Sequence, residues 1–253
     1  MPLLQKTRQF VAENIKPSFH DKRLASIERL KLQQVLKRKN PYLFRAKAVT
    51  SAPELVQQVL DAHLSSNEET LFGEFLESMA IFVCGQKFGG IKSASEGIDL
   101  EFSRDGQRYA VSVKSGPNWG NSRQIKKMIS DFDRVRRIVQ QRERAHVICV
   151  NGCCYGQDAS PNKETGNYLK LCGQDFWLLI SDEADMYKEI VEPLGFEANK
   201  RCDEFKDAYA RVRTRFTKEF IESFCAVDGA LDWAKLIAFN SISKSQWQPL
   251  RNH

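Results

Sequence analysis

Apolar residues recur at helical spacing between Ser51 and Cys84. Ser51 can cap a helix and Pro53 suits its first turn, so a helix is expected to begin here. A second amphipathic stretch runs from Asn67 to Cys84. The pattern therefore predicts two successive helices. The apolar stripe of the second comprises Leu71, Phe72, Phe75, Leu76, Met79, Phe82 and Val83.

The pattern changes between Gly97 and Lys114, where two apolar-rich runs flank the segment Arg104-Asp105-Gly106-Gln107. An Asp-Gly pair between such runs is typical of a tight β-hairpin, because Gly tolerates the positive φ that the turn needs. Centring the turn on this pair places Phe102 opposite Tyr109. The sequence therefore predicts a hairpin of known register.

That register brings polar side chains together at the open end of the hairpin. Asp99 falls opposite Ser112, and alternation along the strand places Ser112 and Lys114 on the face that Asp99 occupies. An acid, a hydroxyl and an amine are therefore expected side by side.

A basic amphipathic helix is predicted from about Ser122, followed by a buried strand at His146–Val150. A strand, a helix and a strand in this order form the crossover that makes a parallel pair. The segment from Asn151 to Gly173 is expected to be an elaborated loop, and the apolar run Phe176–Ile180 a further strand. The apolar positions of the helix comprise Ile125, Met128, Ile129, Phe132, Val135, Ile138 and Val139.

Both ends of the chain are predicted to be helical. Residues 1–39 are basic, and a stripe at helical spacing follows Ser181. We therefore expect an α/β fold with a central mixed sheet flanked by helices. We predict a single domain, 1–253, with a core at about 40–181 and helical additions at 1–39 and 182–253. The stripe comprises Phe205, Ala208, Tyr209, Val212, Phe216, Phe220 and Phe224.

Composition adds little to this picture. The formal net charge is +6, which is compatible with nucleic-acid binding but does not establish it. Seven cysteines scattered through the chain favour reduced thiols over a disulfide framework. No apolar run reaches the length of a membrane span, and we expect a soluble, cytoplasmic protein. The run Lys37-Arg38-Lys39 is either a solvated helix end or a contact with the DNA backbone or a second subunit.

The order of these features resembles the PD-(D/E)xK nuclease superfamily, and from about 40 to 180 it resembles a type II restriction endonuclease. The matching residues are Glu77 or Glu74 on the first helix, Asp99 on the hairpin, and Ser112-Val113-Lys114. The resemblance implies a restriction-endonuclease-like fold. It also implies an Mg²⁺-dependent phosphodiester hydrolase that acts on double-stranded DNA.

One departure from the superfamily pattern lies at Ser112, where an acid is usual. Mg²⁺ prefers an octahedron of hard oxygens that usually includes one or two carboxylates. The resemblance implies that Asp99, Glu77 and the carbonyl of Val113 hold the metal, while Lys114 assists the attacking water. The alternative sources of the missing acid are Glu74, Glu101 and Asp131. The alternative interpretation of Asp99 and Lys114 is a cross-strand ion pair.

The loop after Lys114 and the basic helix are the expected DNA interface. Arg and Lys side chains contact phosphates, whereas Asn and Gln amides can read base edges. The alternative is a solvated, charged helix face, with Trp119 closing the loop. The candidates comprise Asn118, Trp119, Asn121, Arg123, Gln124, Lys126 and Lys127.

These features predict a sequence-specific endonuclease of a restriction system. The resemblance implies a homodimer, because a two-fold protein places one site on each strand of a palindrome. A cognate DNA methyltransferase is expected in the same system. The alternatives are a repair or recombination nuclease of the same fold, or a catalytically inactive DNA-binding module, which Ser112 favours.

Overall fold

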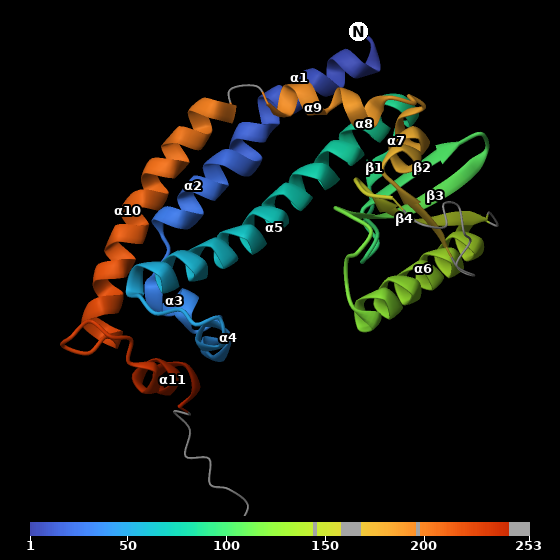
Figure 1. Ribbon diagram of the computed structural model, residues 1–253. Coiled ribbons are helices and arrows are strands. Elements are labelled where there is room, and N and C mark those ends of the chain that lie inside the picture. The colour runs from blue at the N-terminus through green and yellow to red at the C-terminus, as the bar shows by residue number, and fades with distance from the viewer. Residues whose placement is uncertain (144–145, 158–167, 196–197, 243–253) are drawn as a thin grey trace, which may run out of the picture. The chain divides into compact units, whose positions relative to one another are not determined.

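The computed structural model describes residues 1–143, 146–157, 168–195 and 198–242 (Figure 1). The chain divides into two compact units that are interleaved along the sequence. We call Met1–His20 with Thr70–Asn199 the sheet unit, and Asp21–Glu69 with Lys200–His253 the helical unit. The organisation of the chain as a single nuclease domain stays a prediction.

The sheet unit contains a five-stranded sheet in the order β1-β2-β3-β4-β5. The pairs β1-β2 and β2-β3 are antiparallel, and β3-β4 and β4-β5 are parallel. The predicted hairpin is confirmed: Phe102 lies opposite Tyr109, and Asp105 and Gly106 have φ of 50° and 73°. The strands are β1 (Ile91–Lys92), β2 (Leu100–Arg104), β3 (Gln107–Lys114), β4 (Val147–Cys153) and β5 (Leu169–Cys172).

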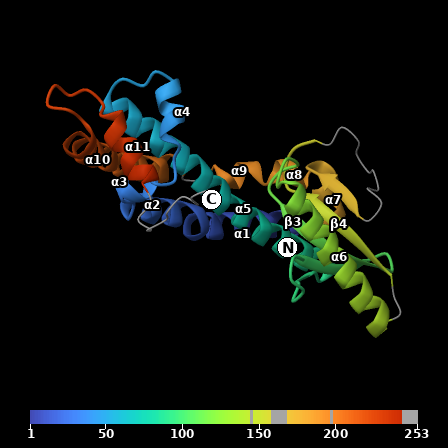
Figure 2. The same cartoon turned by 90° about the horizontal axis from the view of Figure 1, so that it is seen from below.

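Helices cover both faces of this sheet (Figures 1 and 2). Residues of α5 (Ala52–Phe88) pack on one face, where Met79 shares a cluster with Val111. Residues of α6 (Ser122–Glu143) pack on the other, where Phe132 shares a cluster with Ala110. The predicted fold class, a mixed sheet flanked by helices, is therefore confirmed.

The prediction of two helices between Ser51 and Cys84 was wrong, because α5 is continuous. Polar residues between the two stripes suggested a break, but none of them is Gly or Pro. The hydroxyl of Ser66 donates to the carbonyl of Ala62 at 3.3 Å, so this side chain is accommodated within the helix.

The predicted strand at Phe176–Ile180 is instead the helix α7 (Gln174–Ser181). A run of five apolar residues carries too little periodicity to distinguish helix from strand. Its burial is helical, since Phe176, Trp177 and Ile180 are buried while Leu178 is exposed. The segment expected to be a loop also contains the end of β4 and the whole of β5. Residues 158–167 of that segment lie outside the described residues.

The remaining helices are divided between the two units. In the sheet unit, α1 (Leu3–Ile15) leads into a π-helical turn (Lys16–His20), and α8 (Met186–Glu189) and α9 (Val191–Leu194) follow α7. All seven cysteines are free thiols. Within the described ranges, no helix is long and apolar enough to cross a membrane. The helical unit contains α2 (Asp21–Glu28), α3 (Leu32–Leu36), α4 (Pro41–Ala46), α10 (Ala198–Phe224) and α11 (Trp233–Ser241).

Candidate active site

Asp99 directly precedes β2 and is fixed by the hairpin. Its backbone N–H donates to the carbonyl of Val111 at 2.9 Å, so the residue before β2 is still bonded to β3. Its Oδ2 accepts a hydrogen bond from the backbone N–H of Val113 at 2.7 Å and lies 3.4 Å from the Ser112 hydroxyl. The carboxylate is therefore held against β3, opposite Ser112.

Lys114 ends β3 and faces this carboxylate. Its Nζ lies 3.6 Å from Oδ2 of Asp99 and donates to the carbonyl of Val113 at 2.9 Å. The ring of Trp119 covers the ammonium, with 5.0 Å between Nζ and the ring centroid. The structure therefore brings together the acid, the hydroxyl and the amine that the hairpin register indicated.

The oxygens around Lys114 suit a hard cation. The ammonium contacts a carboxylate oxygen of Asp99 and the carbonyl of Val113, which are two of the three oxygens implied as metal ligands. The side chain of Asp99 is about one-fifth exposed, at 22%. Oxygen donors of this kind match the preference of Mg²⁺. These residues therefore suit the binding of Mg²⁺.

Glu77 lies on α5, on the face that meets the end of β3. A Cβ built on Gly73, one turn earlier, would lie 2.7 Å from the Ser115 hydroxyl, so the helix approaches the residue after Lys114 closely. Residues four apart share a helix face, which turns Glu77 the same way. The Glu77 carboxylate also lies 3.5 Å from Nζ of Lys92, and its side chain is partly exposed.

The Cys154 thiol is influenced by the charges of both Glu77 and Lys114. The backbone N–H of Cys154 donates to the carbonyl of Lys114 at 2.8 Å. Burial raises the pKa of the Cys154 thiol, and the nearby Glu77 carboxylate raises it further, whereas the Lys114 ammonium lowers it. Both charges therefore act on one thiol.

Two of the alternative acids have structural partners. Glu101 accepts from Arg108 at 3.0 Å and from the hydroxyl of Ser93. Asp131 is 3% exposed and binds Lys127 at 3.1 Å and Arg134 at 2.7 Å. These contacts are shorter than those of Glu77 with Lys92, at 3.5 Å, and of Asp99 with Lys114, at 3.6 Å. No motif in the sequence indicates these partners.

Asp131 also packs against the turn that leads into Asp99. Gly97 has φ of 80°, and a Cβ at this position would collide with the Asp131 carboxylate. Only a glycine allows this close approach without strain. Asp131 therefore anchors α6 to the segment before Asp99.

Two residues of the expected DNA interface also cap α6. The Oδ1 of Asn121 accepts from the backbone N–H groups of Arg123 and Gln124, at 3.0 and 3.1 Å. The Oε1 of Gln124 accepts from the backbone N–H of Asn121 at 2.8 Å. This reciprocal pair is a capping box, which satisfies helix-end donors. Their amide NH₂ groups stay available as donors.

The cationic candidates on α6 differ in their partners. Lys127 lies 2.9 Å from Glu96, and hydrogen bonds to Glu96 and Asp131 raise the pKa of its ammonium. Arg123 and Lys126 are exposed and form no ion pair within the described part of the chain. Asn118 is also exposed, whereas Trp119 is half-buried against Lys114.

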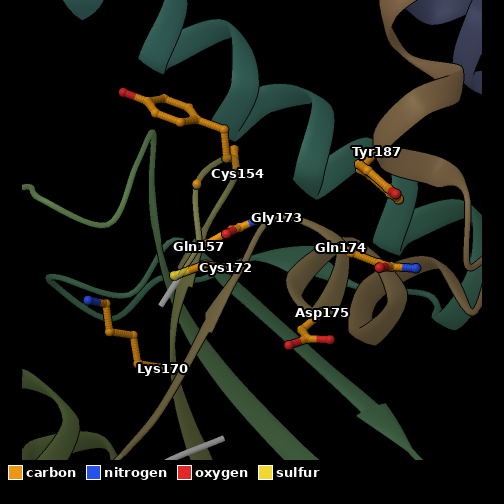
Figure 3. A pocket seen from close by; sticks show the side chains of 10 residues that line it. Cys154, Gln157, Lys170, Cys172, Gly173, Gln174, Asp175 and Tyr187 are labelled. Carbon is orange, nitrogen blue, oxygen red and sulfur yellow. The ribbon is translucent and has the colours of Figure 1, made fainter. Parts of the chain in front are cut away.

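A cavity of about 640 Å³ lies beside this site (Figure 3). Cys154 lines it, and the backbone of Cys154 is bonded to Lys114. Lys170 lies opposite Asn151 and Asn151 opposite Ser112, so all three point to one face of the sheet. The sequence does not reveal that Ser112, Asn151 and Lys170 lie side by side, because β5 was not predicted. The polar lining includes Gln157, Lys170, Gln174, Asp175 and Tyr187.

Comparison with known proteins identifies the relationship. A search of curated proteins found no match. The family model described as type II restriction endonuclease EcoO109I matches residues 5–202, well over half of the 253-residue chain. The matched segment contains Glu77, Asp99, Lys114 and the whole five-stranded sheet. The chain therefore belongs to the EcoO109I family of type II restriction endonucleases.

Proposed function

We propose that this protein is an Mg²⁺-dependent endonuclease that makes sequence-specific double-strand cuts in DNA by phosphodiester hydrolysis. The observation that carries the proposal is the arrangement of Asp99, the Val113 carbonyl and Lys114 at one end of the hairpin. Family membership supports it, because type II restriction endonucleases are DNA-cleaving enzymes.

Asp99, Glu77 and the carbonyl of Val113 would hold the metal. A bound Mg²⁺ would supply Lewis-acid polarisation of the scissile phosphate and a more acidic water. Ser112 carries no charge, so Glu77 supplies the second carboxylate. Its helix approaches the end of β3 at Gly73, which supports this choice.

Lys114 acts at the scissile phosphate. Its ammonium can orient the attacking water by hydrogen bonding, and its charge offsets the negative charge that develops on the phosphate. The contacts with Val113 and Asp99 hold Nζ at the strand end, where the phosphate would lie. The side chain is therefore positioned before substrate binds.

The DNA would lie along the loop after Lys114 and the start of α6. Asn118, Arg123 and Lys126 are exposed there and supply phosphate and base contacts. The amide NH₂ groups of Asn121 and Gln124 remain as donors to base edges. The loss of Lys127 would act mainly through Glu96 and Asp131.

A homodimer would place one such site on each strand of a palindrome. A cognate methyltransferase would protect host DNA, and both enzymes would act in the cytoplasm. A catalytically inactive DNA-binding module is the second candidate, since Ser112 removes a charge that the superfamily pattern normally has at this site.

Incubation of the protein with plasmid DNA and Mg²⁺ tests the proposal. We expect discrete bands whose sequenced ends share one short recognition sequence, and no cleavage when EDTA removes the metal. Binding without Mg²⁺-dependent cleavage would instead support the inactive module. Degradation without a shared end sequence would support a repair or recombination nuclease.

Lys114→Ala is expected to lower the single-turnover cleavage rate by on the order of a hundredfold or more, because it removes the ammonium at the reacting phosphate. Metal affinity should change little. Lys188→Ala, which removes an exposed lysine of α8, is the matched control. A folded Lys114→Ala variant that cuts at the wild-type rate would leave the cross-strand ion pair as the role of this lysine.

A further inference from the structure

Trp119 contacts the side chain of Lys114. Its half-buried ring lies over the Lys114 ammonium, with 5.0 Å between Nζ and the ring centroid. On its other sides, Nζ meets the Val113 carbonyl at 2.9 Å and Oδ2 of Asp99 at 3.6 Å. An aromatic face attracts a cation at this distance. The ring therefore limits the positions that the ammonium can take.

The loop that carries Trp119 is held at both ends. A Cβ on Gly116 would lie 2.5 Å from the Tyr155 ring, so this ring packs directly on the loop backbone. At the other end, the capping box of Asn121 and Gln124 joins the loop to α6. The ring therefore rests on a fixed backbone.

We infer that Trp119 is a positioning residue for Lys114: its ring holds the ammonium at the end of β3. The inference rests on the proposed function, which gives Lys114 its role. It replaces the expectation that Trp119 contacts DNA.

Competitive acetylation of lysines in the metal-free protein tests this directly, without reference to activity. Trp119→Leu should raise the acetylation rate of Lys114 severalfold relative to Lys188, because the ring no longer shields the ammonium. Trp119→Phe, which keeps an aromatic face, should restore most of the protection. Trp119→Gln serves as a second variant if leucine disturbs folding.

Kinetics separate positioning from DNA contact. Trp119→Leu should slow single-turnover cleavage roughly tenfold, which corresponds to about 1.4 kcal/mol in activation free energy. The Kd for duplex DNA, measured without metal, should stay within about twofold of the wild-type value. Unchanged acetylation of Lys114 in the folded variant would overturn the inference. So would a weakened Kd with a normal rate at saturating DNA. A wild-type protein that does not cut would refute the proposed function and leave the acetylation result intact.

A different observation concerns the distribution of charge. In the helical unit, basic side chains outnumber acidic ones by six, which equals the +6 of the whole chain. In the sheet unit the two kinds balance. The basic excess therefore lies outside the unit that contains the candidate active site.

Part of this excess lines a hollow of about 580 Å³. The hollow is formed by the α2-α3 connection, α3 and α10, and Arg215 of α10 donates to the carbonyl of Leu30 at 2.9 Å across it. Arg29, Lys31 and Lys37 also line it and are exposed. No ion pair involves these last three side chains among the residues the structure describes.

The acids of the hollow lie near other cations. Glu219 lies 3.8 Å from Arg215, and Glu28 lies 4.0 Å from Arg211. Their negative charges are therefore partly compensated. Arg29, Lys31 and Lys37 then make the hollow positively charged.

We propose that this hollow binds the phosphate backbone of duplex DNA, as a contact that adds affinity without reading sequence. The proposal rests on the proposed function, since it takes DNA as the polyanion that the basic side chains meet.

The test compares two triple variants with equal charge change. One carries Arg29→Gln, Lys31→Gln and Lys37→Gln. The other, outside the hollow but in the same unit, carries Lys200→Gln, Lys206→Gln and Lys235→Gln. The Kd for a fluorescent duplex is measured without metal over roughly 50 to 200 mM salt. The hollow variant should lower the slope of log Kd against log salt by about 2 to 3, and the control by much less.

Equal slopes in the two variants would overturn the proposal, because net charge alone would then explain binding. An unchanged slope in the hollow variant, with altered sedimentation, would assign the hollow to self-association. Thermal melts confirm that both variants fold. Wild-type protein that neither binds nor cuts DNA would refute the proposed function instead.

Discussion

Asp99→Ala is expected to reduce cleavage by on the order of a thousandfold or more, since a bound metal would contribute several kcal/mol of transition-state stabilisation and Asp99 is one of its proposed ligands. The fold should survive, because Asp99 is not part of the apolar core. Its loss removes an acceptor from the Val113 N–H and the Ser112 hydroxyl and an ion-pair partner from Lys114. The affinity of the variant for duplex DNA, measured without metal, should change little. Single-turnover cleavage and anisotropy measure the two effects.

Asp185→Ala is the matched control for this variant. Asp185 is an exposed acid of the sheet unit that pairs with Lys188 at 2.8 Å. Its removal should leave the cleavage rate unchanged. A folded Asp99→Ala variant that cuts as the wild type does would show that the hairpin is not the active site.

Glu77→Gln is expected to remove most of the cleavage while leaving the free energy of unfolding nearly unchanged. The substitution is isosteric and lies off the apolar stripe of α5, so the core is intact. The carboxylate charge is lost, and Asp99 alone would hold Mg²⁺ poorly because Ser112 carries no charge. Chemical denaturation and cleavage at several Mg²⁺ concentrations measure the two quantities.

Glu69→Gln, an exposed acid earlier on the same helix, is the control for general charge effects. An active Glu77→Gln together with an inactive, folded Asp131→Asn would move the second ligand to α6. An inactive Glu74→Gln or Glu101→Gln would assign it to that position.

The hairpin could be predicted because its information is local. Asp105-Gly106 defines the turn, and strand alternation then determines which side chains meet, so Asp99 and Lys114 were placed together from the sequence alone. The β3-α6-β4 crossover was likewise predictable from a change of period from two to helical.

The strand β5 and the helix α7 were missed for a physical reason. β5 has four residues and gains its stability from pairing with β4, which is a long-range contact without a local signature. The five apolar residues of α7 are compatible with either element. The cavity next to the site, formed partly by these segments, was therefore out of reach of sequence reasoning.

Only some of the partners of the polar and charged side chains could be predicted from the sequence. Nothing in the sequence indicates that Asp131 packs on Gly97 or that Arg108 pairs with Glu101. The spacing of Asn121 and Gln124, by contrast, is that of a capping box and was a usable signal.

Iron-catalysed oxidative cleavage of the polypeptide tests the central claim, that Asp99, Glu77 and Val113 form one metal site. Fe²⁺ takes the place of Mg²⁺, and peroxide with ascorbate generates radicals that cut the backbone near the bound ion. We predict fragments ending near Glu77, Asp99 and Val113, suppressed by excess Mg²⁺ and absent in Asp99→Ala. Fragments clustered near Glu101 or Asp131, or cutting that persists in Asp99→Ala, would contradict the account.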